Sequence, residues 1–330
     1  MFSLRFDLRA PAGGVPAPEM YRAALEMAEW ADEHGALAVT LCEHHASPDG
    51  YLPAPLVMAA AVAARTKRVP IRVAALLAPL RNPVQLAEEI AVLDLVSGGR
   101  VSYVFGLGYR REESELYGLD HKTRAARLDE AVLAVRAAFA GEPLPGRDPA
   151  LRATPVPATP GGPEVLLGGG TVAAVRRAAR LGLGMITETP GLKDAYRRAC
   201  AELGVTPGTF YEAPPDPVTV AFIANDLDRA WERLGPHLLH DARVYADWNQ
   251  QAGKRIDTVL PPAITIDEMR RRGTPYAIFT PAQAAAYIQE RGPLSLSPLC
   301  GGAPPGLGWE TLRLLADEVL PRLVRKSRQS

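Results

Sequence analysis

The chain has 330 residues, of which 47% are hydrophobic and 22% are charged, a composition typical of a globular protein. Its 37 Lys and Arg residues balance 37 Asp and Glu residues, and a neutral chain without a basic run is a poor candidate for binding nucleic acid or an anionic membrane. The three cysteines, Cys42, Cys200 and Cys300, are far apart and form no Cys-x-x-Cys pair. This spacing favours a reducing compartment and argues against a disulfide or zinc framework.

The N-terminal residues 1–8 predict a strand rather than a signal peptide. The longest apolar run, residues 56–64, is about half the length of a membrane span. We therefore expect a cytoplasmic protein that does not enter a membrane.

Short apolar runs alternate with helical patterns along the chain. Asn82-Pro83-Val84-Gln85 is a helix start, with an Asn cap, a proline at the first position and a glutamine three residues after the cap; Gly98-Gly99 ends that helix. Residues 141–163 are dense in Pro and Gly and predict a long loop. The strand-like runs are residues 3–8, 37–42, 69–78, 101–107, 165–168, 184–187, 218–223 and 294–297.

Eight strand-like runs alternating with helices predict a closed (β/α)₈ TIM barrel, and the chain length agrees with that fold. We expect a single domain over residues 1–330. A poorly patterned stretch at about 245–275 predicts an insertion between the last two strands. The alternative is an open doubly wound sheet with a second, smaller domain.

The tripeptide Glu43-His44-His45 directly follows the apolar run 37–42. In a βα-repeat fold that position is the C-terminal mouth of the sheet, where such folds carry their chemistry. Imidazole titrates near neutral pH and can hold or give a proton. The structural alternative is a half-buried histidine paired with Glu43. The sequence contains no His-Glu-x-x-His or His-x-His pattern, so we expect no metal site. His237 and His240 predict a surface pair.

Several segments resemble the bacterial luciferase-like monooxygenase family. They are Glu43-His44-His45, Val73-Ala74-Ala75-Leu76, residues 79–89 and 93–100, Gly168-Gly169-Gly170-Thr171 and residues 177–182. The resemblance covers roughly residues 1–225 in register and weakens afterwards. It implies a (β/α)₈ barrel that binds FMN, or the deazaflavin coenzyme F-420, at its C-terminal mouth.

The resemblance also implies roles for individual residues. His44, with Glu43, forms the catalytic site, where His44 faces the flavin as an acid/base. The Ala74–Ala75 peptide is expected to be cis, or otherwise strained, beneath the flavin ring. The remaining cofactor-binding candidates are Gly106, Gly108, Gly168, Gly169, Gly170 and Thr171. The last four form a plausible phosphate cradle at a helix N-terminus, although a flexible turn with a Thr cap would have the same sequence.

The sequence departs from the family pattern at Leu107, where relatives that use FMN often carry an arginine that meets the phosphate. This leaves the deazaflavin open, and Arg110 or Arg111 are candidate substitutes. The favoured function is monooxygenation of a small organic substrate with O₂ and reduced FMN supplied by a separate flavin reductase. The alternatives are an F-420-dependent dehydrogenase or reductase and a non-catalytic flavin-binding barrel. Relatives of this kind are commonly dimers, so we expect a homodimer.

Overall fold

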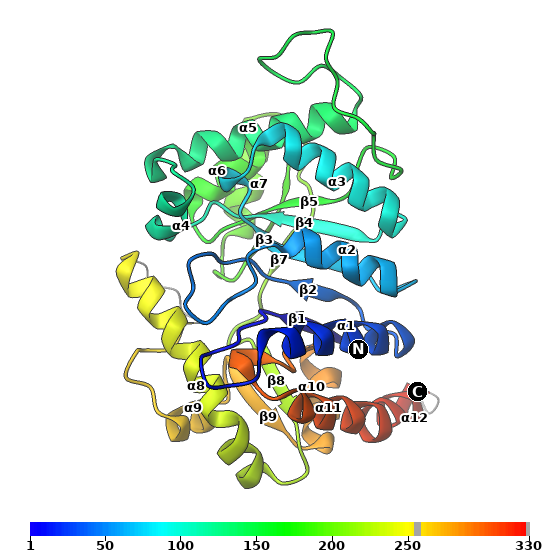
Figure 1. The fold of residues 1–330 in the computed structure, drawn as a ribbon, viewed down its shortest axis with the longest axis vertical. Helices are drawn as coiled ribbons and strands as arrows, with labels where there is room; N and C mark the ends of the chain where they lie inside the picture. Colours follow the sequence, from blue (N-terminus) through cyan, green and yellow to red (C-terminus); the bar gives the residue numbers. More distant parts are fainter. Residues whose placement is uncertain (254–258, 328–330) are drawn as a thin grey trace. The chain divides into compact units, whose positions relative to one another are not determined.

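The computed structural model describes residues 1–253 and 259–327 (Figure 1). The strands are β1 (Phe2–Phe6), β2 (Val39–Leu41), β3 (Ile71–Leu76), β4 (Val101–Phe105), β5 (Val165–Gly168), β6 (Gly184–Thr187), β7 (Phe210–Glu212), β8 (Val220–Ile223), β9 (Tyr276–Phe279) and β10 (Leu294–Leu296). The α-helices are α1 (Ala17–Glu33), α2 (Pro55–Arg65), α3 (Pro83–Ser97), α4 (Arg111–Leu116), α5 (Arg124–Phe139), α6 (Val172–Arg180), α7 (Lys193–Glu202), α8 (Leu227–Gln251), α9 (Ile266–Arg272), α10 (Pro281–Arg291), α11 (Pro305–Leu314) and α12 (Leu320–Ser327). Short turns of other helix types are η1 (Ala78–Leu80), η2 (His121–Thr123), η3 (Cys300–Gly302) and η4 (Leu315–Val319).

The strands form one sheet in the hydrogen-bonded order β7-β6-β5-β4-β3-β2-β1-β10-β8-β9. The strand pairs with a defined register are parallel, from β1 with β10 through to β8 with β9. Parallel neighbours require crossover connections, and helices supply them between most strands. This confirms the α/β class predicted from the alternation of apolar runs and helical patterns.

The residues group into two compact units. Unit 1 contains residues 1–40, 47–52 and 216–330 and therefore holds β1, most of β2, β8, β9 and β10. Its apolar core lies around β8, α8 and β9, where Phe222, Trp231, Leu238 and Met269 are buried together. The Thr311 hydroxyl of α11 lies 3.2 Å from both the N–H and the C=O of Ile223, which ties that helix to the end of β8.

Unit 2 contains residues 41–46 and 53–215, with strands β3 to β7 and helices α2 to α7. Helix α3 packs against α5 and α2, as Figure 1 shows for the cyan and green helices. The start of α3 is as predicted, because the Asn82 side chain accepts hydrogen bonds from the N–H groups of Val84 and Gln85. The Gln85 side chain donates to Glu89 instead of reaching back to the cap residue.

Two strands were missed from sequence. β7 is a three-residue edge strand with no buried residue, so it carries no burial pattern. β9 is a buried four-residue run that lies directly after the cis Thr274–Pro275 bond and before the Thr280 cap of α10. It escaped prediction because prolines flank it closely on both sides.

The predicted insertion at about 245–275 stays a prediction. Residues 245–251 belong to the 25-residue helix α8, residues 266–272 form α9, and residues 254–258 lie outside the described part of the chain. Pro236 lies inside α8 and obscured its length in the sequence. The prediction of one domain over residues 1–330 stays a prediction.

Candidate active site

The sequence-predicted residues of unit 2 lie at one edge of its parallel strands. Glu43 follows the end of β2, Ala74 and Ala75 lie near the end of β3, Gly106 directly follows β4, and Gly168 is the last residue of β5. Because β3, β4 and β5 run parallel, these residues share the carboxyl-terminal edge. This is the edge at which open and closed α/β folds bind ligands.

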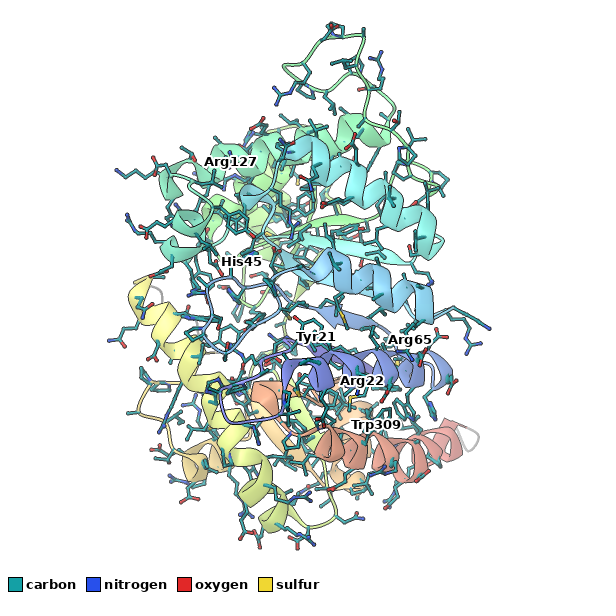
Figure 2. The ribbon with its side chains drawn as sticks, in the orientation of Figure 1. Tyr21, Arg22, His45, Arg65, Arg127 and Trp309 are labelled. Atoms are coloured by element: carbon teal, nitrogen blue, oxygen red, sulfur yellow. The ribbon has the colours of Figure 1, made fainter. Side chains whose placement is uncertain are left out.

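Glu43 is buried at this edge, and both of its carboxylate oxygens make hydrogen bonds. Its Oε2 accepts from the N–H of Leu77 at 2.6 Å, which joins the Glu43 segment to the end of β3. Its Oε1 accepts from Arg81 Nη2 at 2.8 Å and lies 2.9 Å from His45 Nε2. Arg81 itself is held in place from α5, since Arg127 (labelled in Figure 2) donates to the carbonyl oxygens of Pro79 and Arg81. Both oxygens of Glu43 are therefore occupied by protein groups.

Both ring nitrogens of His45 are also engaged. His45, labelled in Figure 2, has Nε2 on Glu43 and Nδ1 3.1 Å from the Tyr117 hydroxyl. The Tyr117 ring meets His45 edge-on, with the ring centroids 5.0 Å apart. Burial, and after it the negative charge of Glu43, raises the pKa of Tyr117, so its hydroxyl is protonated and can donate to Nδ1. A carboxylate only accepts, so His45 carries its proton on Nε2.

His44 faces a different carboxylate. Its Nδ1 lies 2.8 Å from Glu113 Oε1, and its side chain is 10% exposed whereas that of Glu113 is 1% exposed. The Tyr109 ring meets His44 edge-on, with the centroids 5.7 Å apart. The two neighbouring histidines therefore belong to two separate carboxylate pairs, His44 with Glu113 and His45 with Glu43.

Glu113 Oε1 receives further donors. The N–H of His45 lies 3.0 Å away and Arg110 Nη1 lies 3.4 Å away. Burial alone would raise the pKa of the Glu113 carboxyl, but the hydrogen bonds from His44 and His45 and the charges of His44 and Arg110 outweigh it and hold that pKa below its usual range. Glu113 is therefore ionised at neutral pH.

Arg110 is buried and donates to the carbonyl oxygen of His45 at 2.6 Å as well as to Glu113. It thus ties the start of α4 to the histidine segment. Arg111 is exposed. From the sequence, Arg110 and Arg111 are candidate substitutes for the arginine that relatives carry in place of Leu107. Neither observation supports that role.

The Ala74–Ala75 peptide bond is cis, as expected from the sequence. The register of β3 on β4 shifts between Ala74 and Leu76 at this point. A Cβ at Gly106 would lie 2.9 Å from the Ala75 Cβ, so only glycine fits opposite the small side chain there. Gly108 has a φ of 71°, a backbone conformation that favours glycine.

The Gly168–Thr171 turn leads into α6. The Thr171 side chain caps the helix by accepting from the N–H of Ala174 at 3.2 Å, and the Gly169 N–H donates to the Ile186 carbonyl at 3.3 Å. A Cβ at Gly169 would lie 2.7 Å from the Ala174 Cβ, and one at Gly170 would lie 2.4 Å from the Thr189 hydroxyl. Close packing within unit 2 therefore explains these two glycines independently of any ligand.

Three site residues were not singled out from the sequence: Arg81, Glu113 and Tyr117. Glu113 is one of three glutamates in the segment Arg111-Glu112-Glu113-Ser114-Glu115, and nothing local distinguishes it. Its burial on the inner face of α4 is a tertiary property. Arg81 lies within a segment used for the family resemblance, but its ion pair with Glu43 has no signal in the sequence.

Unit 1 holds a second polar cluster around the buried guanidinium of Arg9. Its Nε lies 3.0 Å from Asp241 and 3.3 Å from Asp7, and its Nη1 lies 2.5 Å from Asp49. The rings of Tyr51, Tyr245 and Trp248 lie 4.6, 5.3 and 4.9 Å from the guanidinium carbon. Possible ligand atoms of Asp7, Asp241 and Cys300 lie within 4.8 Å of one another, but Arg9 already supplies a positive charge there.

His237 and His240 do not form a pair directed at one ligand. His240 Nε2 lies 2.8 Å from Asp49 Oδ2, whereas His237 Nδ1 lies 3.3 Å from the Gly301 carbonyl oxygen. Within the described residues, no helix combines the length and apolar character that a membrane crossing needs.

Residues 2–268 match the family model described as luciferase-like monooxygenase. The oxygenase component of flavin-dependent trigonelline monooxygenase from Acinetobacter baylyi is 29% identical over 143 residues, which are 43% of this chain and 40% of that protein. The chain thus aligns with less than half of the length of this curated relative.

Solved structures give the same fold over nearly the whole chain. The oxygenating constituent of 3,6-diketocamphane monooxygenase from Pseudomonas putida, in complex with FMN, has a TM-score of 0.71 at 18% identity, covering 98% of this chain and 99% of that one. An F420-dependent secondary alcohol dehydrogenase has a TM-score of 0.68 at 17% identity, covering 98% of both chains. These likenesses, with the parallel α/β sheet, confirm the predicted luciferase-like (β/α)₈ barrel fold. The chain belongs to the luciferase-like monooxygenase family.

Proposed function

We propose that this protein is the oxygenase component of a two-component system, which uses reduced FMN and O₂ to oxygenate a small organic substrate. The family match supports an oxidoreductase of the monooxygenase type. The trigonelline relative is named as an oxygenase component, which supports a separate flavin reductase as partner. The observation that carries the proposal is the placement of His44 at the carboxyl edge of the unit 2 strands, held by an ionised carboxylate.

The residues of this edge fit a flavin. Gly106, Ala74 and Ala75 place no bulky side chain at the ends of β3 and β4, which would let a planar ring approach the backbone there. The start of α6 offers the positive end of a helix dipole and the Thr171 hydroxyl to a phosphate. The bound flavin would supply the reducing electrons and the reaction with O₂.

The protein's own contribution is proton handling. His44 is the residue that gives or takes a proton beside the flavin, because both ring nitrogens of His45 and both oxygens of Glu43 are engaged by other protein groups. Glu43, expected from the sequence to be catalytic, thus acts by holding His45 and the end of β3. A deazaflavin-dependent dehydrogenase is the second candidate, favoured by the structural likeness to the F420-dependent enzyme and by Leu107 in place of an arginine.

Anaerobic titration of the protein with reduced FMN, and separately with reduced coenzyme F-420, tests the proposal. We expect reduced FMN to bind. We also expect the time course of its oxidation by air, monitored by stopped-flow absorbance, to change when the protein is present. If only the deazaflavin binds, the dehydrogenase proposal takes the place of the monooxygenase proposal. If neither cofactor binds, both proposals are contradicted.

A further inference from the structure

We propose that the Asp7 carboxyl, buried in unit 1, is a proton-binding site that holds a proton at neutral pH and releases it only in alkaline solution. Three carboxyl groups, those of Asp7, Asp49 and Asp241, lie around the guanidinium of Arg9, and all four residues belong to unit 1. The inference concerns the protein without any cofactor and does not depend on the proposed function.

The first observation is the number of hydrogens that Arg9 offers. Its Nε carries one hydrogen, and Asp241 Oδ1 accepts it at 3.0 Å. Asp7 Oδ2 lies 3.3 Å from the same Nε but accepts no hydrogen bond there, because the only hydrogen is directed at Asp241. Arg9 Nη1 donates to Asp49, and Nη2 has no acceptor among the described residues. The guanidinium therefore gives no hydrogen to Asp7.

The second observation is that the other two carboxylates are well supplied with hydrogen bonds. Asp241 accepts from Arg9 on Oδ1 and from the Tyr276 hydroxyl on Oδ2, the latter at 2.8 Å. Asp49 Oδ2 accepts from Arg9 at 2.5 Å and is hydrogen-bonded to His240 Nε2 at 2.8 Å. Hydrogen bonds to the charged form favour ionisation, so both residues have the surroundings of an ionised carboxylate.

Asp7 lacks such partners. Its Oδ1 accepts only from the backbone N–H of Arg9, at 3.4 Å, and its Oδ2 has no hydrogen-bond donor within the part of the chain that the structure describes. The residue is 4% exposed, so solvent offers no substitute for the missing donors. A buried carboxylate without donors is far more costly than a neutral carboxyl in the same place. Of the three acids, Asp7 is therefore the one that keeps its proton.

The charged and titratable groups that face Asp7 act in the same direction on balance. They are Arg5 and Arg9 on its own segment, Asp241 on α8 and Cys300 on η3. Side-chain atoms of Asp7, Asp241 and Cys300 lie within 4.8 Å of one another, so an ionised Asp7 would lie beside a second anion. Burial, and after it the charge of Asp241, raises the pKa of Asp7, and the charges of Arg9 and Arg5 with the backbone hydrogen bond offset this only in part.

A proton bound in this way makes the stability of unit 1 depend on pH. An aspartate in the unfolded chain ionises near about pH 3.9, whereas folded Asp7 stays protonated to higher pH. Between these two values the folded state binds one proton more than the unfolded state, so the folding equilibrium falls by up to about tenfold per pH unit as the pH rises. Once ionised, Asp7 would compete with Asp241 for the Nε hydrogen of Arg9 and weaken the cluster that holds segment 47–52.

Nuclear magnetic resonance of the ¹³C-labelled, cofactor-free protein tests the protonation state directly. The side-chain carboxyl carbon of an aspartate changes its chemical shift on ionisation, and the Asp7 signal is assigned through its own backbone N–H, without any variant. EDTA in the buffer keeps trace metal ions from the carboxylates. At neutral pH we expect the signal of Asp7 to be that of a neutral carboxyl and the signal of Asp241 to be that of an ionised one. An ionised Asp7 at neutral pH would overturn the proposal.

Two matched variants test the consequence for stability. Asp7→Asn mimics the neutral carboxyl at every pH, whereas Asp241→Asn removes an ionised partner of Arg9. Tryptophan fluorescence reports the urea unfolding of unit 1, because that unit contains all four tryptophans. We expect Asp7→Asn to unfold at a higher urea concentration than the wild type at neutral pH, and Asp241→Asn at a lower one.

The pH series gives the decisive comparison. From about pH 5 to about pH 9, a window above the unfolded pKa of aspartate, the advantage of Asp7→Asn over the wild type should grow as the pH rises and level off where Asp7 ionises in the folded protein. Asp247→Asn, an exposed change on α8, should stay close to the wild type throughout. An Asp7→Asn protein that does not fold, that unfolds at a lower urea concentration than the wild type at neutral pH, or whose advantage does not change with pH would contradict the proposal.

Discussion

Two adjacent imidazoles of the same chemical type have different surroundings in this protein. The ring nitrogens of His45 lie against Glu43 and Tyr117, whereas Nδ1 of His44 lies against Glu113 and the His44 side chain is slightly exposed. His44 contacts Glu113 within α4, whereas His45 contacts Tyr117 at the end of that helix and Glu43 on its own segment. His44 and His45 are therefore expected to have different roles although they are residues of the same type.

Replacement of His44 should separate catalysis from stability. We expect His44→Gln to lower the protein-dependent turnover by about 10² to 10⁴-fold, the usual contribution of a general acid or base, while FMN affinity stays nearly the same. His45→Gln should instead lower the melting temperature, because it removes buried hydrogen bonds to Glu43 and Tyr117. Stopped-flow absorbance and thermal unfolding measure the two effects; equal rates for His44→Gln and the wild type would remove His44 from the mechanism.

The phosphate site can be tested at Val172, an exposed residue at the start of α6. Gly169→Val is a poor test, since its Cβ would collide with Ala174 whether or not a ligand binds there. Val172→Asp places a negative charge where the phosphate is expected. Because a negative charge at a helix N-terminus is favourable, Val172→Asp should leave the stability of the fold unchanged or raise it. The same charge should weaken FMN binding by at least about 10-fold.

Val172→Asn is the uncharged control for this experiment. Its FMN affinity, measured by fluorescence titration, should stay near that of the wild type. If Val172→Asp leaves the FMN affinity unchanged, the phosphate binds at another part of the protein.

At the level of elements, the segment 47–52 is attached to unit 1 through Asp49. The Asp49 carboxylate accepts a hydrogen bond from Arg9 and is hydrogen-bonded to His240 of α8. Burial opposes its ionisation, but these hydrogen bonds and the Arg9 charge hold the pKa of Asp49 well below its usual range. An acid whose pKa is depressed on folding stabilises the fold above its unfolded pKa and loses that contribution as the pH falls. Acid should therefore weaken this attachment.

We expect Asp49→Asn to lower the free energy of unfolding by about 3 kcal/mol at neutral pH, because Arg9 loses one of its buried partners. The difference from the wild type should be complete above about pH 5 and should narrow progressively below about pH 4, where the carboxylate in the unfolded chain becomes protonated. Urea unfolding at a series of pH values measures it. Asp247→Asn, an exposed change on α8, is the control; a difference that does not depend on pH would contradict the role of the Asp49 charge.

At the scale of the whole molecule, bound FMN should stabilise the fold by mass action. At a concentration about 100 times its dissociation constant a ligand adds ~2.7 kcal/mol, which corresponds to several degrees in melting temperature. Riboflavin lacks the phosphate and should give a smaller increase at the same concentration. Equal increases for both compounds would show that the phosphate contributes nothing.

The sequence was most informative where the structural cause is local. The strands β5 and β6 have the predicted bounds, because each is a short apolar run closely bounded by glycine or proline. The helix at Pro83 begins as predicted because its cap lies within four residues. Glu43-His44-His45 stood out because an acid and two imidazoles directly follow an apolar run, at the strand end where α/β folds carry their chemistry.

Tertiary contacts could not be predicted in the same way. The pairing of Glu113 with His44 joins residues 69 positions apart, and that of Arg81 with Glu43 joins residues 38 positions apart. The strand β9 was missed because four residues between prolines carry too little pattern. Local rules therefore predicted most of the strands and singled out Glu43, His44 and His45 as candidates, whereas the partners that orient these side chains depend on the completed fold.

The pairing of β1 with β10 also affects how the chain folds. Phe2, Ser3 and Leu4 lie opposite Leu294, Ser295 and Leu296, so this pairing joins residues that are 292 positions apart in the sequence. Unit 2 is almost contiguous in the chain, and its strands β3 to β7 can associate in the order in which they are made. Unit 1 instead combines residues 1–40 with residues 216–330, so the pairing of β1 with β10 is a long-range contact of the kind that slows folding.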